Sequence, residues 1–228
     1  MIVKVPKSSQ RYKITFVLMA LNITFYVYCV IVGGNALEIN RSIITILGQS
    51  NWLILEYGFP FYYQLFTSMF IHANLMHIVG NLMFLLIFGL RAEEMFTLPE
   101  YLGIYLLGGL TGNLLSLAFG PEYLSVGASG AIFALFGACI IYDRKAAQQS
   151  IIGALIFAGF LFIINMGPNI NHLSHLGGLV FGLIAGYLLA SKRKPEEENQ
   201  YTINYYHSYQ TISHRQQEAL AAVALSSN

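Results

Sequence analysis

Ser129 opens a hydrophobic segment that is too short to cross a membrane. It lies in the small-residue run 127–130 (Gly-Ala-Ser-Gly), and the apolar stretch that follows ends at Asp143. A helix from Ser129 to Asp143 is about 21 Å long at 1.5 Å per residue, against a hydrocarbon core of roughly 30 Å. If Asp143 marks one water boundary, the Ser129 hydroxyl lies about 10 Å below the other. A polar group at that depth, preceded by glycine-rich backbone, must line a protein-enclosed or water-filled cavity, where a hydroxyl can serve as a nucleophile.

Three further polar side chains fall at a similar depth on two other apolar segments. Counted from the basic residues that end their segments, His77 lies about 21 Å, Asn81 about 15 Å and His175 about 25 Å along its helix. Each has a simple structural explanation when it is taken alone. Ser129 could be a packing residue, His77 and Asn81 an interhelical hydrogen-bonding pair, and His175 a satisfied core histidine. Four polar groups near one level of a membrane are better explained by a functional site.

These residue types suit acyl transfer. A serine hydroxyl needs a base within hydrogen-bond reach, and His175 is the natural base for Ser129. Because the apolar segments hold acidic residues only near their charged ends, the sequence predicts a dyad rather than a triad. Phe133 stands one helical turn after Ser129 and could stack on the imidazole. The Ser129 backbone N–H at a helix N-terminus, with the His77 and Asn81 side chains, could stabilise an oxyanion.

Small residues predict that the helices carrying this dyad approach closely. Gly127 permits a tight backbone approach beside the oxyanion donors. The segments that follow Ser129 and His175 each carry a ridge of small residues at four-residue spacing, which lets membrane helices pack backbone to backbone. The ridges consist of Gly130, Ala134 and Ala138 in one segment and Gly178, Gly182 and Gly186 in the other. Pairing the ridges would bring the Ser129 hydroxyl near the His175 imidazole.

The composition sets the class of protein that must position these residues. Hydrophobic residues make up 56% of the 228 positions and charged residues 10%, where a soluble domain has about 25% charged. The sequence therefore predicts an all-α polytopic membrane protein. The candidate spans, of which the fourth is the short one, are residues 13–33, 69–90, 100–119, 129–142, 150–166 and 172–190.

No cofactor, metal or nucleic acid is expected. The net charge is +1, which gives no reason for a nucleic-acid partner. The histidines lack a third metal-ligating neighbour, and no phosphate-binding loop is present. Cys29 and Cys139 both fall inside apolar segments, so a disulfide is not expected.

The distribution of basic residues predicts the orientation. With a cytoplasmic N-terminus, every one of the 12 lysines and arginines except Arg41 falls on the cytoplasmic side. Both termini are then inside, and the site opens toward the extracytoplasmic face of the cell membrane. The predicted organisation is a cytoplasmic segment (1–12), a six-helix membrane domain (13–191) and a polar, largely disordered cytoplasmic tail (192–228). The aromatic-rich connection 34–68 is expected to form an interfacial hairpin or amphipathic element.

The motifs resemble those of the rhomboid intramembrane serine proteases, over about residues 60–190. The sequence 127–130 is similar to the family's GxSG nucleophile motif on the fourth span. The sequence 175–182 resembles the HxxGxxxG motif of the sixth span. The sequence 77–81 matches the HxxxN pattern of the second span, whose side chains help to form the family's oxyanion hole.

Other positions agree with the resemblance, and one departs from it. His72 and Glu93 look like the family's structural histidine and its glutamate at the cytoplasmic end of the second span. Phe133 falls where the family has an aromatic residue against the catalytic histidine. His72 also lies near the outer boundary, so it is expected to be a wet structural cap. Tyr63-Gln64 replaces the Trp-Arg pair that many members have in the first loop, which concerns the anchoring of that loop rather than the chemistry.

The resemblance implies a six-helix rhomboid-like bundle with a short fourth helix. It implies a serine endopeptidase in the lipid bilayer that cleaves transmembrane segments of single-span membrane proteins through a Ser129–His175 dyad. The alternative is a catalytically inactive rhomboid-like protein that binds membrane clients, which loss of either dyad residue would indicate; both are present. A small transporter would require inverted repeats or paired interrupted spans, and the sequence has only one short span.

Overall fold

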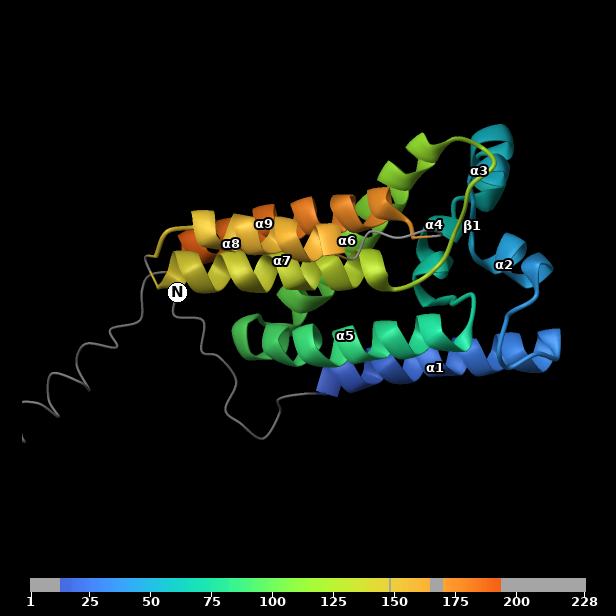
Figure 1. Cartoon of the computed structure of the whole chain (residues 1–228), viewed down its shortest axis with the longest axis horizontal. Coiled ribbons are helices and arrows are strands. Elements are labelled where there is room, and N and C mark those ends of the chain that lie inside the picture. The colour runs from blue at the N-terminus through green and yellow to red at the C-terminus, as the bar shows by residue number, and fades with distance from the viewer. Residues whose placement is uncertain (1–12, 148, 165–169, 194–228) are drawn as a thin grey trace, which may run out of the picture. The chain divides into compact units, whose positions relative to one another are not determined.

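The computed structural model of the chain describes residues 13–147, 149–164 and 170–193. The predicted segment 1–12 and nearly all of the predicted tail 192–228 lie outside the described residues, so their predictions stay untested. The principal helices are α1 (Lys13–Gly33), α5 (Leu75–Met95), α6 (Leu98–Ser116), α7 (Ser129–Ala146), α8 (Ile152–Ile164) and α9 (His172–Lys192) (Figure 1).

Four helical stretches in the described part of the chain are long and apolar enough to cross a membrane. They are α1, α5, α6 with its 3-10 extension to Phe119, and α9. The predicted all-α membrane class is confirmed, whereas the count of six crossing helices stays a prediction. The described part of α8 has 13 residues, and residues 165–169, which follow it, lie outside the described residues.

The start of α5 and the end of α7 differ from the sequence prediction by several residues, for physical reasons. The second span begins at Leu75 rather than residue 69, because the Asn74 side chain caps α5 by accepting the His77 backbone N–H at 2.8 Å. Helix α7 continues beyond Asp143 to Ala146. Basic residues are favourable near a helix C-terminus, so Arg144 and Lys145 belong to the last turn of α7 rather than to the connection after it.

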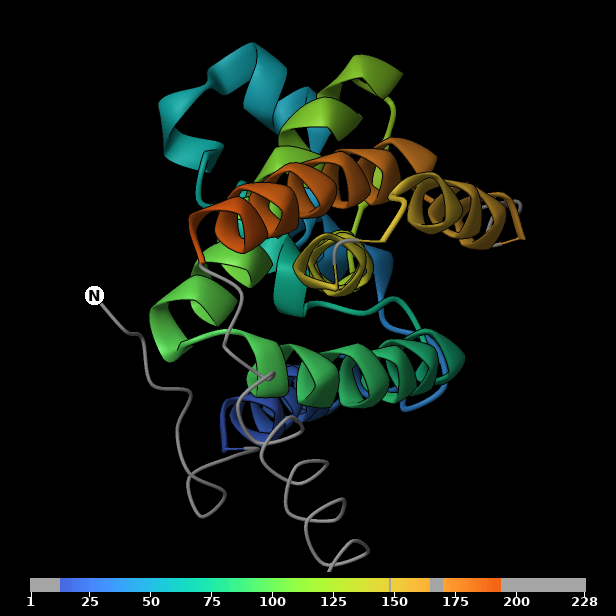
Figure 2. The same ribbon diagram turned by 90° about the vertical axis from the view of Figure 1, so that its left-hand side faces the viewer.

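Helix α7 lies in the middle of the bundle. Figure 2 looks almost along its axis and shows other helices around it, and α7 contacts α5, α6, α8 and α9. Its apolar residues face every direction, which is typical of a helix buried on all sides. Ser129, as the first residue of α7, is therefore positioned inside the bundle.

The predicted pairing of the small-residue ridges on α7 and α9 is confirmed. Cβ atoms added at Gly178, Gly182 and Gly186 would overlap the carbonyl oxygens of Gly130, Ala134 and Ala138, respectively. The two backbones therefore touch at three successive turns, as small-xxx-small ridges allow. Because the first contact lies next to Ser129, the start of α9 is held against the start of α7.

Short elements gather at one end of the bundle, which we call the loop end (Figure 1). The helices there are α2 (Arg41–Leu47), α3 (Asn51–Tyr57) and α4 (Gln64–Thr67), with 3-10 turns at Phe59–Phe61 and Ser68–Phe70. Strands β1 (Gln49–Ser50) and β2 (Leu124–Ser125) pair in antiparallel fashion, with Gln49 opposite Ser125. This strand pair was not predicted, because two residues are too few for an alternating pattern. It ties the first connection to the segment that leads into α7.

Gln64 anchors the loop end at the position where the sequence departs from the family's Trp-Arg pair. Its side chain is fully buried. The amide oxygen accepts the Ser50 N–H at 2.9 Å, and the amide nitrogen donates to the Thr45 and Ile46 carbonyls at 2.8 and 3.1 Å. The Tyr63 hydroxyl also donates to the Ile46 carbonyl, at 2.9 Å. A neutral amide and a phenol thus hold this loop together.

Replacing Gln64 with alanine is expected to lower the free energy of unfolding by about 1–3 kcal/mol, because buried backbone groups lose their partners. Thermal unfolding of the purified protein in detergent measures this. Gln149→Ala, which removes an exposed glutamine, serves as the matched control. Equal melting temperatures for the two variants would contradict the anchoring role of Gln64.

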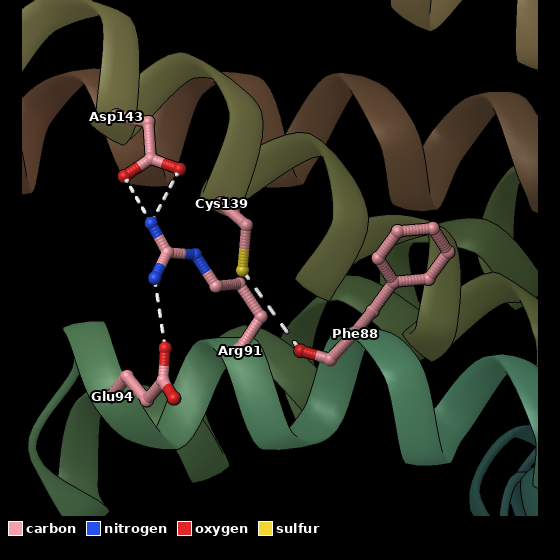
Figure 3. Close-up of polar contacts among 5 residues, drawn as sticks. All are labelled: Phe88, Arg91, Glu94, Cys139 and Asp143. Carbon is pink, nitrogen blue, oxygen red and sulfur yellow. Dashed lines mark hydrogen bonds and ion pairs between the residues drawn. The ribbon is translucent and has the colours of Figure 1, made fainter.

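The opposite end of the bundle carries Arg91, Arg144, Lys145 and Lys192, and we call it the basic end. An ion pair links α5 to α7 there. One Arg91 nitrogen lies 2.9 Å from each Asp143 carboxylate oxygen, and the other lies 2.8 Å from Glu94 (Figure 3). Figure 3 also shows Cys139 on α7 directed at the Phe88 carbonyl, with the sulfur 3.9 Å from the oxygen. These contacts hold α5 beside α7 on the side of the bundle away from the loop end.

Breaking this ion pair is expected to have a small effect. The Arg91 and Asp143 side chains are each 48% exposed, and exposed ion pairs contribute about 0.2–1 kcal/mol. Arg91→Gln should therefore lower stability by less than about 1 kcal/mol, and a double-mutant cycle with Asp143→Asn measures the coupling. Arg144→Gln is the control, since the Arg144 guanidinium at the same end donates to an uncharged partner, the Gln149 side chain, at 3.1 Å. A coupling well above this range would contradict the assignment of a solvent-screened pair.

Glu93 connects α5 to α1. Its carboxylate accepts the backbone N–H of Thr15 at 2.6 Å. Thr15 lies in the first turn of α1, where backbone N–H groups have no intrahelical partner. The glutamate therefore satisfies a helix start, a role that its position at the end of a predicted span does not reveal.

Candidate active site

The structure brings Ser129 and His175 into direct contact. The Ser129 Oγ lies 2.7 Å from the His175 Nε2, a hydrogen-bond distance between residues 46 positions apart in the sequence. His175 is 8% exposed and lies in the first turn of α9. In the described part of the chain, no carboxylate forms a hydrogen bond or ion pair with this imidazole.

Phe133 holds the plane of the imidazole. Its ring stacks on His175 with a centroid distance of 4.5 Å and an interplanar angle of 22°. Phe133 in turn packs edge to face against Phe136 and Phe162. An aromatic stack supported in this way restricts rotation of the imidazole, which is the role that a carboxylate has in a triad.

Gly127 meets two constraints that exclude other residues. Its φ is +118°, a conformation that residues with a Cβ rarely adopt, and an added Cβ would lie 2.7 Å from the His77 Nε2. Its N–H donates to the Ser68 carbonyl at 2.9 Å, which fixes the backbone just before Ser129. The same Cβ would lie 3.8 Å from the Asn81 Nδ2. The His77 and Asn81 side chains on α5 therefore face the segment that carries Ser129.

Hydrogen-bond donors surround the approach to Ser129. The Asn81 Nδ2 donates one hydrogen to the His77 carbonyl at 2.9 Å and has a second one to give. The Ser129 N–H lies at the start of α7, where N–H groups have no intrahelical partner and the helix dipole favours negative charge. Together with the His77 ring, these groups could stabilise an oxyanion.

A cavity of about 1100 Å³ contains the site. Ser129, His175, His77 and Asn81 all line it. Its deeper wall is apolar and comes from α5, α7 and α8, through Gly80, Phe84, Phe88, Ile132, Phe136 and Leu161. Its rim at the loop end is polar and includes Asn35, Glu38, Arg41 and Glu122. A cavity of this size admits an extended peptide segment, with polar surroundings at one end and apolar surroundings at the other.

The prediction that His72 is a wet cap near the boundary is wrong. The residue is fully buried rather than a wet cap. Its ring lies edge to face against His77, with a centroid distance of 5.2 Å. The turn before α5 folds inward, as the 1% exposure of Ile71 shows, so a residue close to the predicted boundary lies behind the site. His72 thus supports His77 from behind.

Ser174 was not identified from the sequence, although it packs between α6, α7 and α9 beside His175. A Cβ added at Gly130 would lie 2.6 Å from the Ser174 Oγ, and one added at Gly112 on α6 would overlap its carbonyl oxygen. Helices α6, α7 and α9 thus meet around one serine beside His175. Gly112 and Gly130, which face Ser174, indicate a close contact at this point. A single sequence does not show which side chain they accommodate.

These features define a class of protein. It is a helical membrane bundle with a serine–histidine pair, a facing histidine–asparagine pair and a cavity that both pairs line. The family model "Rhomboid domain" matches residues 61–192, more than half of the chain. The chain therefore belongs to the rhomboid family, and it is a multi-pass membrane protein.

Similar proteins carry the same family name. The chain is 34% identical over 149 residues to RHOMBOID-like protein 6, mitochondrial, of Arabidopsis thaliana, covering 63% of this chain and 48% of that protein. It is 32% identical over 183 residues to Rhomboid protease GluP of Bacillus subtilis (strain 168), covering 77% of this chain and 34% of that protein. It is 28% identical over 192 residues to Rhomboid-like protease 3 of Toxoplasma gondii, covering 78% and 69%. The chain thus spans about half or less of the length of the first two relatives.

Proposed function

We propose that this chain is a rhomboid-type intramembrane serine endopeptidase that cleaves transmembrane segments of single-span membrane proteins. The observation that carries the proposal is the 2.7 Å contact between the Ser129 Oγ and the His175 Nε2, inside a cavity between membrane helices. Two of the similar proteins are named as proteases, which supports the same class of activity.

The proposed reaction uses the dyad twice. The His175 Nε2 accepts the hydroxyl proton as the Ser129 Oγ attacks the carbonyl carbon of the scissile peptide bond. The same imidazole then gives this proton to the departing amine, which leaves an acyl-enzyme on Ser129. Water attacks the ester with His175 as base, and the serine regains its proton when the acid product departs.

Charge stabilisation in this proposal comes from both sides of the cavity. The tetrahedral intermediate places a negative charge on the former carbonyl oxygen. The Ser129 N–H, the His77 ring and the Asn81 amide are the donors offered to it. Gly127, Gly130 and Gly178 act indirectly, because they let these donors and the dyad approach without a side chain between them.

The shape of the cavity supports a transmembrane segment as the substrate. An amide inside a substrate helix is hydrogen-bonded and unavailable, so the helix must unwind before Ser129 can attack. The polar rim supplies groups for an unwound backbone, while the apolar wall accommodates membrane side chains. With the basic end on the cytoplasmic side of the cell membrane, the rim opens toward the extracytoplasmic face. Neither a cofactor nor a metal ion is part of this proposal.

A single-span reporter in proteoliposomes tests the proposed function. The purified full chain is expected to cut the reporter within or at the edge of its transmembrane segment, with the site located by mass spectrometry of both fragments. A reporter that stays intact while it co-purifies with the chain would contradict the proposal. That outcome would favour the inactive, client-binding alternative.

A further inference from the structure

We propose that the hydrogen bond between Asn171 and Ser125 positions the candidate dyad, so that Asn171 and Ser125 are positioning residues for the Ser129–His175 contact. The inference rests on the proposed function. It goes beyond it by assigning a task to two residues that neither attack the substrate nor transfer a proton. The bond joins the Asn171 Nδ2 to the Ser125 Oγ at 2.6 Å.

The Asn171–Ser125 hydrogen bond and the His175–Ser129 contact join residues with the same spacing on both chain segments. Ser125 precedes Ser129 by four residues, and Asn171 precedes His175 by four. Both pairs are 46 residues apart in the sequence. The start of α9 and the segment entering α7 are thus joined twice, once by the candidate dyad and once by a pair of neutral side chains.

Ser125 is a fixed attachment point. It lies in β2 opposite Gln49 of β1, and its side chain is 5% exposed. The Gln49 side chain is itself fully buried and donates to the Asn51 side chain and the Ser116 hydroxyl at 2.8 and 2.9 Å. A hydrogen bond to Ser125 therefore attaches the start of α9 to the packed loop end of the bundle.

Asn171 transmits this attachment to His175 within one helical turn. Its side-chain oxygen accepts the Ser174 N–H at 2.9 Å, and its carbonyl accepts the His175 N–H at 3.1 Å. The oxygen of Asn171 thus caps α9 while its nitrogen holds Ser125. One side chain sets both the start of the helix and its distance from the segment before Ser129.

This arrangement matters because the candidate dyad has no carboxylate to orient its base. Phe133 fixes the plane of the ring, but a stacked ring can still slide toward or away from the hydroxyl. The Asn171–Ser125 bond limits that sliding. Misplacement of reacting groups by about 1 Å can cost about 100-fold in rate.

Two variants separate this role from simple helix capping. Ser125→Ala removes the bond and leaves the cap on α9. Asn171→Ser keeps a hydroxyl that can cap α9 but is too short to reach Ser125. Each is expected to lower kcat on the single-span reporter about 10- to 100-fold and to leave KM within about twofold. The double variant should be no worse than either single one, and Ser125→Thr, which keeps the hydroxyl, should restore kcat.

Thr15→Val is the matched control. The Thr15 hydroxyl is also buried and hydrogen-bonded, at 3.2 Å from the Tyr101 hydroxyl, but it joins α1 to α6 beside Glu93, away from the cavity. Thr15→Val should lower the melting temperature without changing kcat more than about twofold. If Ser125→Ala leaves kcat unchanged, or lowers it only in proportion to a loss of folded protein as Thr15→Val does, the inference is overturned.

A spectroscopic measurement keeps this test separate from the proposed function. The 15N chemical shift of the His175 Nε2 reports its hydrogen bond to Ser129 whether or not the chain cleaves anything. Ser125→Ala should move this shift toward that of Ser129→Ala, while Thr15→Val should leave it in place. A wild-type chain without cleavage activity would contradict the proposed function alone, whereas an unmoved shift in Ser125→Ala would contradict the positioning role.

Discussion

Ser129→Ala is expected to lower cleavage of a single-span reporter by at least about 10⁴-fold, because it removes the hydroxyl that would form the acyl-enzyme. His175→Ala should reduce cleavage to a similar extent, since an unassisted serine hydroxyl is a poor nucleophile. The double variant should be no slower than either single variant, because two residues that act as a unit do not contribute additively. The measurement is single-turnover cleavage in proteoliposomes.

The control for this loss is a serine on the same helix as His175. Ser191 lies near the other end of α9, where its hydroxyl donates to the Tyr187 carbonyl at 2.8 Å. Ser191→Ala should retain wild-type cleavage, and all variants should insert into the membrane and melt near the wild-type temperature. Cleavage retained in Ser129→Ala or His175→Ala would contradict the dyad.

Gly178→Ala is expected to damage both stability and activity. The added methyl group would overlap the Gly130 carbonyl, so α7 and α9 must move apart. Overpacking of this kind costs about 1–3 kcal/mol. Because the same helices carry Ser129 and His175, their separation should also lower kcat by at least about 100-fold. Thermal unfolding and reporter cleavage measure the two effects.

Gly103→Ala is the control for the loss of a helix glycine. Gly103 lies on α6, and an added Cβ would meet nothing within 4 Å. Alanine at such a position should stabilise the protein by about 0.5–1 kcal/mol through its higher helix propensity. Should Gly178→Ala behave like Gly103→Ala in both assays, close contact between α7 and α9 would not be what holds the site together.

The sequence was sufficient to predict the helix pairing and the contact between Ser129 and His175. Both depend on regular features. Small residues at four-residue spacing lie on one face of a helix in any fold. Gly130 and Gly178 could therefore be assigned to helix faces that pack closely. Polar residues inside apolar segments are costly, so Ser129 and His175 stood out against their neighbours.

The sequence could not predict what happens at the loop end. Gln64 is an ordinary polar residue in a loop until the Ser50 N–H and two carbonyls converge on it. His72 counted as a surface residue because distance along a helix says nothing about a turn that folds inward. The Asn171–Ser125 bond joins two connecting segments, whose relative placement depends on the whole bundle. Irregular backbone has no period from which such contacts can be derived.

Covalent labelling by a fluorophosphonate tests the central claim most directly, because this reagent reacts with serines that a neighbouring base activates. The intact chain in detergent should gain a single adduct, which mass spectrometry of its peptides places on Ser129. His175→Ala should lose the adduct while it stays folded, and Ser191→Ala should keep it. An adduct on a different serine, or equal labelling of Ser129 with and without His175, would contradict the dyad.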